Sequence, residues 1–235
     1  MKKISLILAL LLVAALCLAS CGDDPIDDDG KITGGWTYSN VEPGTLPEDA
    51  EAAFAEALDG FDGASYKPLA CIGKQIVSGI NYAVIAQKTV VSSDTDPELS
   101  VLFISKSVSG TTKLTSIKPF KVDDYVGDGE DSDAKGSTLT GGWVVPTTGE
   151  LTTMPQKLAS AWSDATSDYD GMSFEVLASV GTQAVAGTNY ALICRGKTVS
   201  LDANSGIYLV VLSVDLSDNA TISSVSPIDV SEIAK

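Results

Sequence analysis

The stretch Gln183-Ala184-Val185-Ala186-Gly187 decides the fold, because Gln75-Ile76-Val77-Ser78-Gly79 shows the same pattern earlier in the chain. Gly34-Gly35-Trp36 recurs in the same way as Gly141-Gly142-Trp143, and both stretches recur at nearly the same offset along the chain. So steady an offset indicates two tandem copies of one folded unit. A solenoid is excluded, because its repeats would be much shorter.

The sequence predicts two domains joined by a charged linker. We call residues 33–122 repeat 1 and residues 140–235 repeat 2. Residues 123–139 between them are rich in acidic and small residues, which suits an extended linker. The acids of residues 128–133 also suggest calcium, but the glycine and glutamate of a helix–loop–helix calcium site are misplaced. A solvated linker without a metal is therefore favoured.

The N-terminal segment is organised like a bacterial lipoprotein signal over residues 1–20. Lys2 and Lys3 precede an apolar run over residues 4–18, which is too short to cross a bilayer. Leu18-Ala19-Ser20-Cys21 resembles a lipobox, which implies acylation of Cys21 and anchoring by acyl chains. The alternative is an ordinary secretory signal in which Cys21 is incidental. The expected location is the bacterial cell envelope, as an outer-membrane lipoprotein that faces either the periplasm or the outside.

Acidic residues dominate the chain. Residues 21–32 contain five aspartates, which predicts a solvated, disordered tether and also resembles the acidic export signal of some bacterial surface lipoproteins. Removal of residues 1–20 takes away two lysines and no acid, so the net charge falls from −16 to −18. Nucleic acid and anionic lipid are therefore unexpected partners.

The chain contains no histidine, which excludes catalytic dyads and metal sites that depend on imidazole. No nucleophile motif or phosphate-binding loop is present either, so we expect neither an enzyme nor a cofactor. Of the cysteines outside the signal and the lipidation site, Cys71 and Cys194 fall at non-equivalent places in the two repeats. Two buried free thiols are therefore favoured over a disulfide between them, which an oxidising compartment would permit.

Each repeat is predicted to contain one helix followed by four strands. Residues 47–58 begin with proline, carry acids in the first turn and place apolar residues at helical spacing. The same stripe in repeat 2 is Leu151, Met154, Leu158, Ala161 and Trp162. The expected strands are 65–77, 80–91, 99–108 and 112–122, then 173–185, 188–199, 207–214 and 221–230. An antiparallel sheet with a helix across one face follows, which is an α+β arrangement.

The order of glycine segment, helix, strand, Gln-x-Val-x-Gly turn and two further strands resembles the cystatins. Residues 183–190, Q-A-V-A-G-T-N-Y, look very like the Q-V-V-A-G-T-N-Y stretch of stefin-type members. Repeat 2 is the closer match at this turn, and the element order agrees over nearly the whole of both repeats. The resemblance implies two tandem cystatin-like domains, each with one helix packed across a four-stranded antiparallel sheet.

Cystatins inhibit papain-like cysteine proteases through a wedge made of an N-terminal segment and hairpin turns. The resemblance therefore implies a lipid-anchored inhibitor whose partner is a papain-like cysteine protease. The protease-binding residues that it implies are Gly34, Gly35, Trp36, Gln75, Ile76, Val77, Ser78 and Gly79, with Gly141, Gly142, Trp143, Gln183, Ala184, Val185, Ala186 and Gly187. Many cystatins carry Pro-Trp in the second hairpin, whereas residues 109–111 and 216–219 here contain no aromatic side chain.

Other interpretations of the same residues stay open. The scaffold could serve a non-catalytic surface module that binds another protein, a peptide or a glycan. Val77 and Val185 could belong to the core, with the turn glycines needed only for backbone shape. Trp36 and Trp143 could anchor a partner, although a role in closing the helix–sheet core is favoured.

Overall fold

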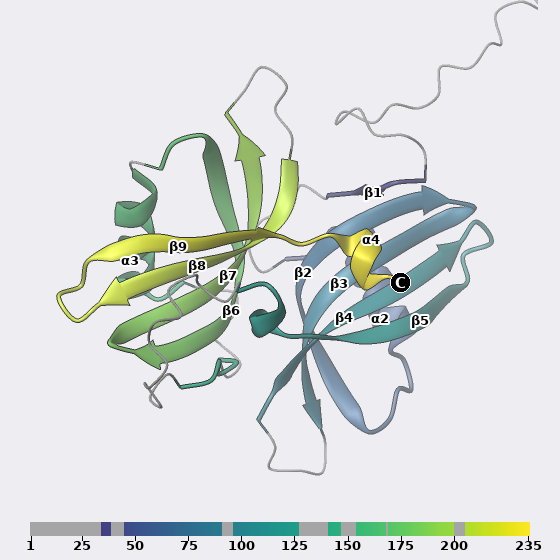
Figure 1. Ribbon diagram of the computed structural model, residues 1–235. Helices are drawn as coiled ribbons and strands as arrows, with labels where there is room; N and C mark the ends of the chain where they lie inside the picture. Colours follow the sequence, from purple (N-terminus) through teal and green to yellow (C-terminus); the bar gives the residue numbers. More distant parts are fainter. Residues whose placement is uncertain are drawn as a thin grey trace, which may run out of the picture. The chain divides into compact units, whose positions relative to one another are not determined.

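The computed structural model describes residues 34–38, 45–90, 96–126, 141–146, 154–167, 169–199 and 205–235. The predicted signal peptide, the tether with Cys21, residues 127–139 of the linker, Thr140 and Leu151 lie outside these residues. Residues 34–235 form one compact unit. The described part is a mixed fold with two antiparallel sheets, of five and four strands, and few helices (Figure 1).

Repeat 1 forms the five-stranded sheet, in the order β1-β2-β3-β4-β5. Its elements are β1 (Trp36–Thr37), α2 (Glu48–Ala57), β2 (Ala64–Val77), β3 (Gly79–Val90), β4 (Glu98–Ser107), β5 (Thr112–Phe120) and the 3₁₀ helix η1 (Val122–Asp124). The two-residue strand β1 was not predicted. It adds the glycine–tryptophan segment to the edge of the sheet beside β2.

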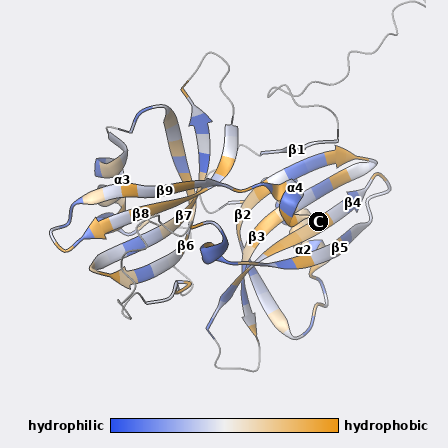
Figure 2. Ribbon diagram, in the orientation of Figure 1, coloured by the Kyte–Doolittle hydropathy of each residue, from blue (hydrophilic) through white to orange (hydrophobic). Residues whose placement is uncertain are grey.

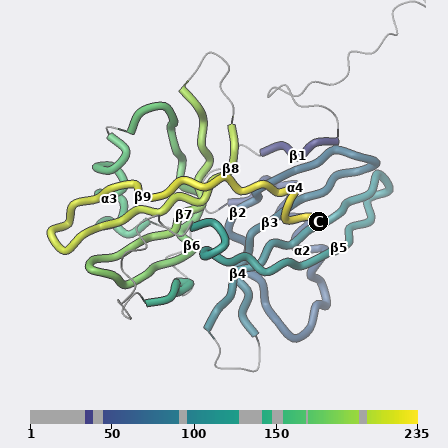
Figure 3. Tube along the Cα trace, viewed as in Figure 1, coloured from purple at the N-terminus to yellow at the C-terminus, as the bar shows by residue number. Residues whose placement is uncertain are grey.

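Repeat 2 forms the four-stranded sheet, in the order β6-β7-β8-β9. Its elements are α3 (Gln156–Ser167), β6 (Met172–Val185), β7 (Gly187–Thr198), β8 (Ser205–Asp215), β9 (Ala220–Pro227) and α4 (Val230–Ile233). Figure 3 traces the chain through the two repeats in turn. The predicted helix and four strands of each repeat are confirmed.

The predicted C-terminal end of the last strand is wrong in each repeat. β5 ends at Phe120 and β9 at Pro227, and a short helical segment follows each of them instead. In α4, the Asp229 carboxylate accepts a hydrogen bond from Ser231 N at 2.8 Å and caps the turn. Val122 and Val230, which were predicted to lie in strands, thus belong to these helical segments.

The start of the predicted linker is also different from the expectation. Residues 123–126 are not an extended segment, since η1 continues to Asp124. The Tyr125 ring stacks on Phe120 with 5.0 Å between centroids, and Val126 packs against the same hydrophobic cluster. Burial of these apolar side chains outweighs the charge of the neighbouring aspartates.

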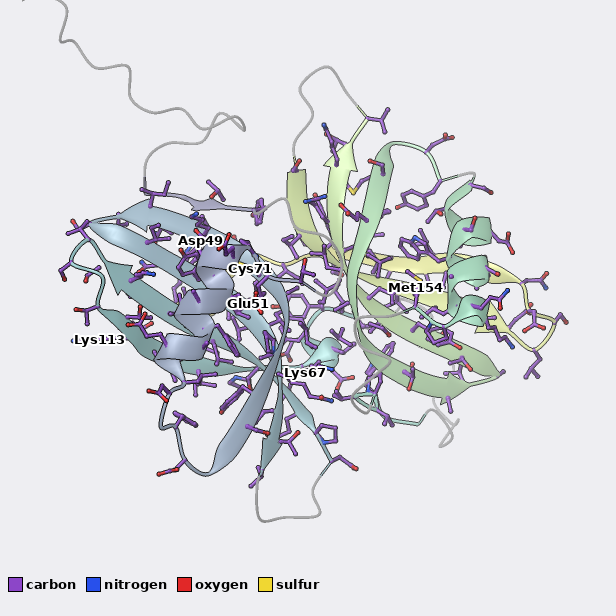
Figure 4. The ribbon with its side chains drawn as sticks, turned by 180° about the vertical axis from the view of Figure 1, so that it is seen from behind. Asp49, Glu51, Lys67, Cys71, Lys113 and Met154 are labelled. Atoms are coloured by element: carbon purple, nitrogen blue, oxygen red, sulfur yellow. The ribbon has the colours of Figure 1, made fainter. Side chains whose placement is uncertain are left out.

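The longer helix of each repeat, α2 or α3, covers one face of its own sheet. α2 begins after Pro47, whose carbonyl accepts the first helical hydrogen bond from Glu51 N at 2.8 Å. Its apolar stripe, with Ala53 and Phe54, packs against Tyr82 and its neighbours on the central strands. In repeat 2, α3 covers the equivalent face with Leu158 and Ala161. Figure 4, which views the molecule from behind, shows α2 and α3 each packed on the sheet of its own repeat.

The opposite faces of both sheets are apolar too, and they belong to one hydrophobic cluster. Nineteen described buried residues, drawn from both repeats, make up this shared cluster. Residues 82–86 of β3 form an unbroken run in which every residue is fully buried. Such a run is typical of a strand that is covered on both faces. Figure 2 shows hydrophobic residues along the strands of both sheets.

Cys71 and Cys194 are both buried, in agreement with the sequence analysis. They lie in two different clusters, Cys71 under α2 and Cys194 under α3. Burial in apolar surroundings raises the pKa of the Cys194 thiol well above its ordinary value. The described structure therefore gives these thiols a packing role.

Candidate functional site

Three segments of repeat 1 meet at one end of its sheet. Trp36 of β1 pairs with Gln75 of β2, so the N-terminal segment lies along the strand that enters the first turn. That turn has Ser78 at its tip. Gly79 in turn pairs with Ser107, the last residue of β4, so the second turn starts beside the first. We call this the hairpin end of repeat 1.

Repeat 2 has a hairpin end of the same design. Val144 and Thr182 form a β-bridge, with N···O distances of 2.8 and 2.9 Å in the two directions. Gly141 N donates to Ala184 O at 3.3 Å, and Gly187 pairs with Asp215 at the end of β8. The predicted site segments thus come together in both repeats, although repeat 2 has a single bridge where repeat 1 has β1.

Backbone geometry alone makes glycine necessary at both first turns. Gly79 has a φ of +128° and Gly187 a φ of +129°, in the region that side chains disfavour. A Cβ atom on Gly79 would lie 2.2 Å from Lys106 O, and one on Gly187 would lie 2.1 Å from Val214 O. The last residue of the Gln-x-Val-x-Gly pattern is therefore explained by the close approach of the neighbouring strand.

The glutamine of the pattern is held by bonds within the chain. Gln75 Nε2 donates to Gly34 O at 2.9 Å, and Asn81 Nδ2 donates to Gln75 Oε1 at 2.8 Å. In repeat 2, Asn189 Nδ2 donates to Gln183 Oε1 at 2.9 Å. These bonds cross the first hairpin, and in repeat 1 they also tie the N-terminal segment to it. The recurring asparagine therefore has a positioning role that the sequence analysis did not assign.

The apolar residues of the first turn are open to solvent in repeat 1. Ile76 is 53 % exposed and Val77 is 48 % exposed. The interpretation that Val77 belongs to the core is therefore wrong. In repeat 2, Val185 is half-buried and its neighbours Ala184 and Ala186 are exposed.

The second turn of each repeat presents one aliphatic side chain that the sequence analysis missed. Val108 is 88 % exposed, and Leu216, its equivalent in repeat 2, is 84 % exposed. The available signal was a single apolar residue among polar turn residues at matching positions. Each of these side chains offers a small apolar contact in the second turn.

Internal hydrogen bonds hold the second turns in shape. The Asp215 carboxylate accepts bonds from Ser217 N at 2.8 Å and from Asn219 N at 2.9 Å. Bonds from the Asn219 side chain and backbone lower the pKa of Asp215. In repeat 1, Ser107 Oγ accepts from Thr111 N at 3.1 Å. Both loops are thus shaped before any partner binds.

The tryptophans pack on the sheet faces that point away from the helices. Trp36 and Trp143 lie against the shared cluster, and the Trp36 ring meets Phe103 edge-on with 5.9 Å between centroids. The prediction that they close the helix–sheet core is therefore wrong about the face. Each ring lies over a glycine of the adjacent strand, Trp36 over Gly73 and Trp143 over Gly181. Both are half-buried packing residues beside the hairpin ends.

A charged group under the hairpin end distinguishes repeat 1. Asp49 Oδ2 accepts a hydrogen bond from Tyr82 Oη at 2.9 Å and pairs with Lys74 Nζ at 2.6 Å. Figure 4 labels Asp49 near the start of α2. Burial raises the pKa of Asp49, but the bonds from Lys74 and Tyr82 outweigh it and hold this pKa below its ordinary value. Burial and the bond to Asp49 raise the pKa of Tyr82.

A cavity of about 400 Å³ lies at the other end of the repeat 1 strands, near Leu99, Phe120 and Trp143. Its charged residues include Lys88 and Glu98, which pair with each other at 2.9 Å. Across the described residues, no group of three His, Cys, Asp or Glu side chains is arranged to hold a metal ion. Of the predicted binding residues, Trp143 lines this cavity and the others do not.

Comparison with known proteins leaves the site to be interpreted from its own geometry. No protein-family model matches the sequence, and no curated protein matches it. Among the helices of the described residues, none combines the length and the hydropathy that a membrane span needs.

Proposed function

We propose that this protein is a lipid-anchored inhibitor of papain-like cysteine proteases, built from two tandem cystatin-like domains. One observation carries the proposal. In each repeat, the glycine segment, the first turn and the second turn lie together at one end of the sheet. Apolar side chains that are exposed in these turns are suited to burial in a protease cleft.

The physical argument for repeat 1 is that its hairpin end is both apolar and held in place. Ile76, Val77 and Val108 supply exposed aliphatic surface, whose burial in a cleft is favourable. The Gln75 amide ties the N-terminal segment to the hairpin, so little conformational freedom is lost on binding. At Gly34 the φ of +99° turns the chain, and no heavy atom lies within 4 Å of where a Cβ would be.

Repeat 2 supports the same use with less apolar surface in its first turn. In the first turn, repeat 2 has Ala184 where repeat 1 has the bulkier Ile76. In the second turn, repeat 2 has Leu216, whose exposed side chain is larger than that of Val108 in repeat 1. We therefore propose two inhibitory ends per chain, with unequal affinities.

Titration of papain tests the proposal directly. Residues 21–235 with Cys21→Ser would be added to active-site-titrated papain and to a cathepsin at micromolar concentration. We expect a stoichiometric loss of activity, with up to two proteases bound per chain. An undiminished rate at every ratio would remove the inhibitor proposal for this protease class.

Matched variants assign the contact to a repeat. Ile76→Asp with Val77→Asp should weaken binding by repeat 1 by roughly a hundredfold, because charges would enter an apolar contact. Ala184→Asp with Val185→Asp is the matching change in repeat 2. Val199→Asp is the control, since Val199 is 74 % exposed but lies at the far end of β7. Equal effects of all three changes would show that the hairpin ends are not the contact.

A non-catalytic binding module is the second candidate. The absence of an aromatic side chain in either second turn favours it, because this absence reduces the apolar surface that a protease could contact. If the folded protein leaves papain and the cathepsin active, the same hairpin ends become the surface to test against peptides and glycans.

We also propose that acyl chains on Cys21 hold the protein in the bacterial envelope. The support is the lipobox-like stretch that ends at this residue. Mass spectrometry of the purified N-terminal peptide should find a diacylglycerol adduct, and Cys21→Ser should release the protein from the membrane fraction. Surface labelling of intact cells would then distinguish a periplasmic from an external location.

A further inference from the structure

The shared cluster between the sheets has an internal symmetry. Eighteen of its nineteen buried residues form nine pairs of equivalent positions, one in each repeat. The two members of a pair are separated along the chain by the same number of residues as Gln75 and Gln183. Examples are Leu69 with Leu177 and Val122 with Val230. Phe103 is the one member without an equivalent in the cluster. The two repeats therefore contribute the same set of positions to one common core.

The ends of the two repeats also cross over in the same way. A Cβ placed on Gly73 of β2 would lie 3.3 Å from Val230 Cγ2 of repeat 2 and 2.9 Å from Trp36 Cε3. A Cβ placed on Gly181 of β6 would lie 3.4 Å from Val122 Cγ2 of repeat 1 and 3.0 Å from Trp143 Cε3. The last helical segment of each repeat thus covers the glycine and tryptophan of the other. Both last strands end just before a valine that is almost fully buried.

Reciprocal contacts of this kind define an isologous interface, in which position i of one unit meets position j of the other and the reverse also holds. The equivalent strands β2 and β6 are themselves in contact, as they would be on either side of a two-fold axis that passes between them. Polar contacts accompany the apolar ones, since Ser226 Oγ donates to Tyr125 O at 2.5 Å and the buried Gln87 Nε2 donates to Pro146 O at 2.8 Å.

We propose that the sheet face opposite the helix is an isologous association surface whose partner is a second copy of the same repeat. Within one chain, the partner is the other repeat. A lone repeat would expose the whole apolar face, and large exposed apolar patches on soluble proteins mark association sites. The pairing of equivalent positions selects a second copy over an unrelated protein. This proposal does not depend on protease inhibition.

The test starts from the full folded chain. A site for a specific protease is inserted within residues 127–140 of the Cys21→Ser protein, and the folded protein is cut there. We expect the two halves to stay together as one complex of unchanged mass, measured by light scattering and native mass spectrometry. On long incubation, exchange should also give pairs of two first halves and pairs of two second halves.

Interface variants make the result specific. Val122→Asp with Val230→Asp should raise the dissociation constant of the cut halves by more than about a hundredfold, because two carboxylates would be buried in an apolar face. Val122→Ala with Val230→Ala is the milder pair in case the first does not fold, which circular dichroism of the uncut chain reports. It should weaken the complex by about tenfold or more. Val199→Asp is the control and should leave the complex intact.

Two outcomes would overturn the inference. Separation of the cut, unsubstituted halves into monomers at micromolar concentration would remove the association surface. A complex that persists as the mixed pair alone, with no exchange into like pairs after the halves are dissociated and recombined, would contradict its isologous character.

Discussion

In repeat 1 the first turn exposes Ile76 and Val77, whereas repeat 2 places the small Ala184 and the half-buried Val185 at the same positions. The backbone hardly differs, since Gly79 and the corresponding glycine of repeat 2 have φ values of +128° and +129°. What the duplication has kept is therefore the set of residues that backbone geometry demands. What it has changed is the apolar surface that a partner would meet.

The support beneath the two hairpin ends differs as well. In repeat 1, Asp49 joins α2 to the sheet through Lys74 and Tyr82. At the equivalent helix position repeat 2 has Lys157, whose Nζ instead pairs with Asp218 of the second turn at 2.7 Å. One ion pair lies under the first hairpin and the other is an exposed contact to the second. The two ends should therefore respond differently to the same kind of substitution.

The largest expected effect concerns the turn glycines and should be the same in both repeats. Gly79→Val and Gly187→Val should each lower the free energy of unfolding by about 3 kcal/mol or more, from the left-handed φ and the clash with a carbonyl. Urea unfolding followed by circular dichroism measures this loss. Gly110→Ala is the control, because Gly110 has a φ of +87° but open space around it, and it should cost only about 1–2 kcal/mol. Equal losses at all three positions would contradict the close approach.

The next effect concerns the tryptophan–glycine contacts. Gly73→Ala and Gly181→Ala should each cost about 1–3 kcal/mol, because the added methyl would press on a tryptophan ring 2.9 or 3.0 Å away. In a double-mutant cycle, Trp36→Ala should remove much of the cost of Gly73→Ala. Strict additivity of the two changes would show that the ring does not limit this position.

A smaller effect should appear in repeat 1 alone. Tyr82→Phe removes the hydroxyl that bonds to Asp49, and it should cost roughly 1 kcal/mol after allowance for the partly exposed carboxylate. Tyr190→Phe is the matched change in repeat 2 and should be close to neutral. Similar losses in thermal unfolding of the two variants would contradict the difference between the repeats.

The same group predicts a pH dependence. Because the pKa of Asp49 is lower in the folded than in the unfolded chain, the folded state binds fewer protons between the two values. This stabilisation is present above the ordinary pKa of 3.8 and is lost as the pH falls through the lower folded value. Asp49→Asn should therefore flatten the acid side of the stability profile, whereas Lys157→Gln should not. Urea unfolding at a series of acidic pH values measures both profiles.

The smallest effect on stability, with a clear effect on binding, is expected at the second turns. Val108→Ser and Leu216→Ser should change the free energy of unfolding by less than about 0.5 kcal/mol, because both side chains are exposed. If the hairpin ends bind a protease, each change should weaken its own repeat about threefold to tenfold, and Leu216→Ser more than Val108→Ser. Papain titration compares the two losses of affinity. Each variant is made in a chain in which the first turn of the other repeat carries the two aspartates, so that only the tested repeat binds.

The sequence by itself determined the duplication, the order of helix and strands, and the need for glycine at the first turns. Each of these depends on local properties, namely hydrophobic periodicity and the φ values that a side chain permits. The resemblance to the cystatins, and not residue spacing, implied that the N-terminal glycine segment lies beside the first hairpin. The strand pairing and the isolated bridge place the segment there in both repeats.

Only the tertiary structure decided what covers the second face of each sheet. The fully buried run of residues 82–86 indicates this second layer, since a strand whose residues are buried on both faces of the sheet must be covered on both faces. The identity of that layer is not a local property, because it depends on residues of the other repeat that supply the matching apolar face. For the same reason Val122 and Val230 leave their predicted strands, and both tryptophans lie on the face opposite the helices. Burial against the other repeat outweighs the local preference for a longer strand.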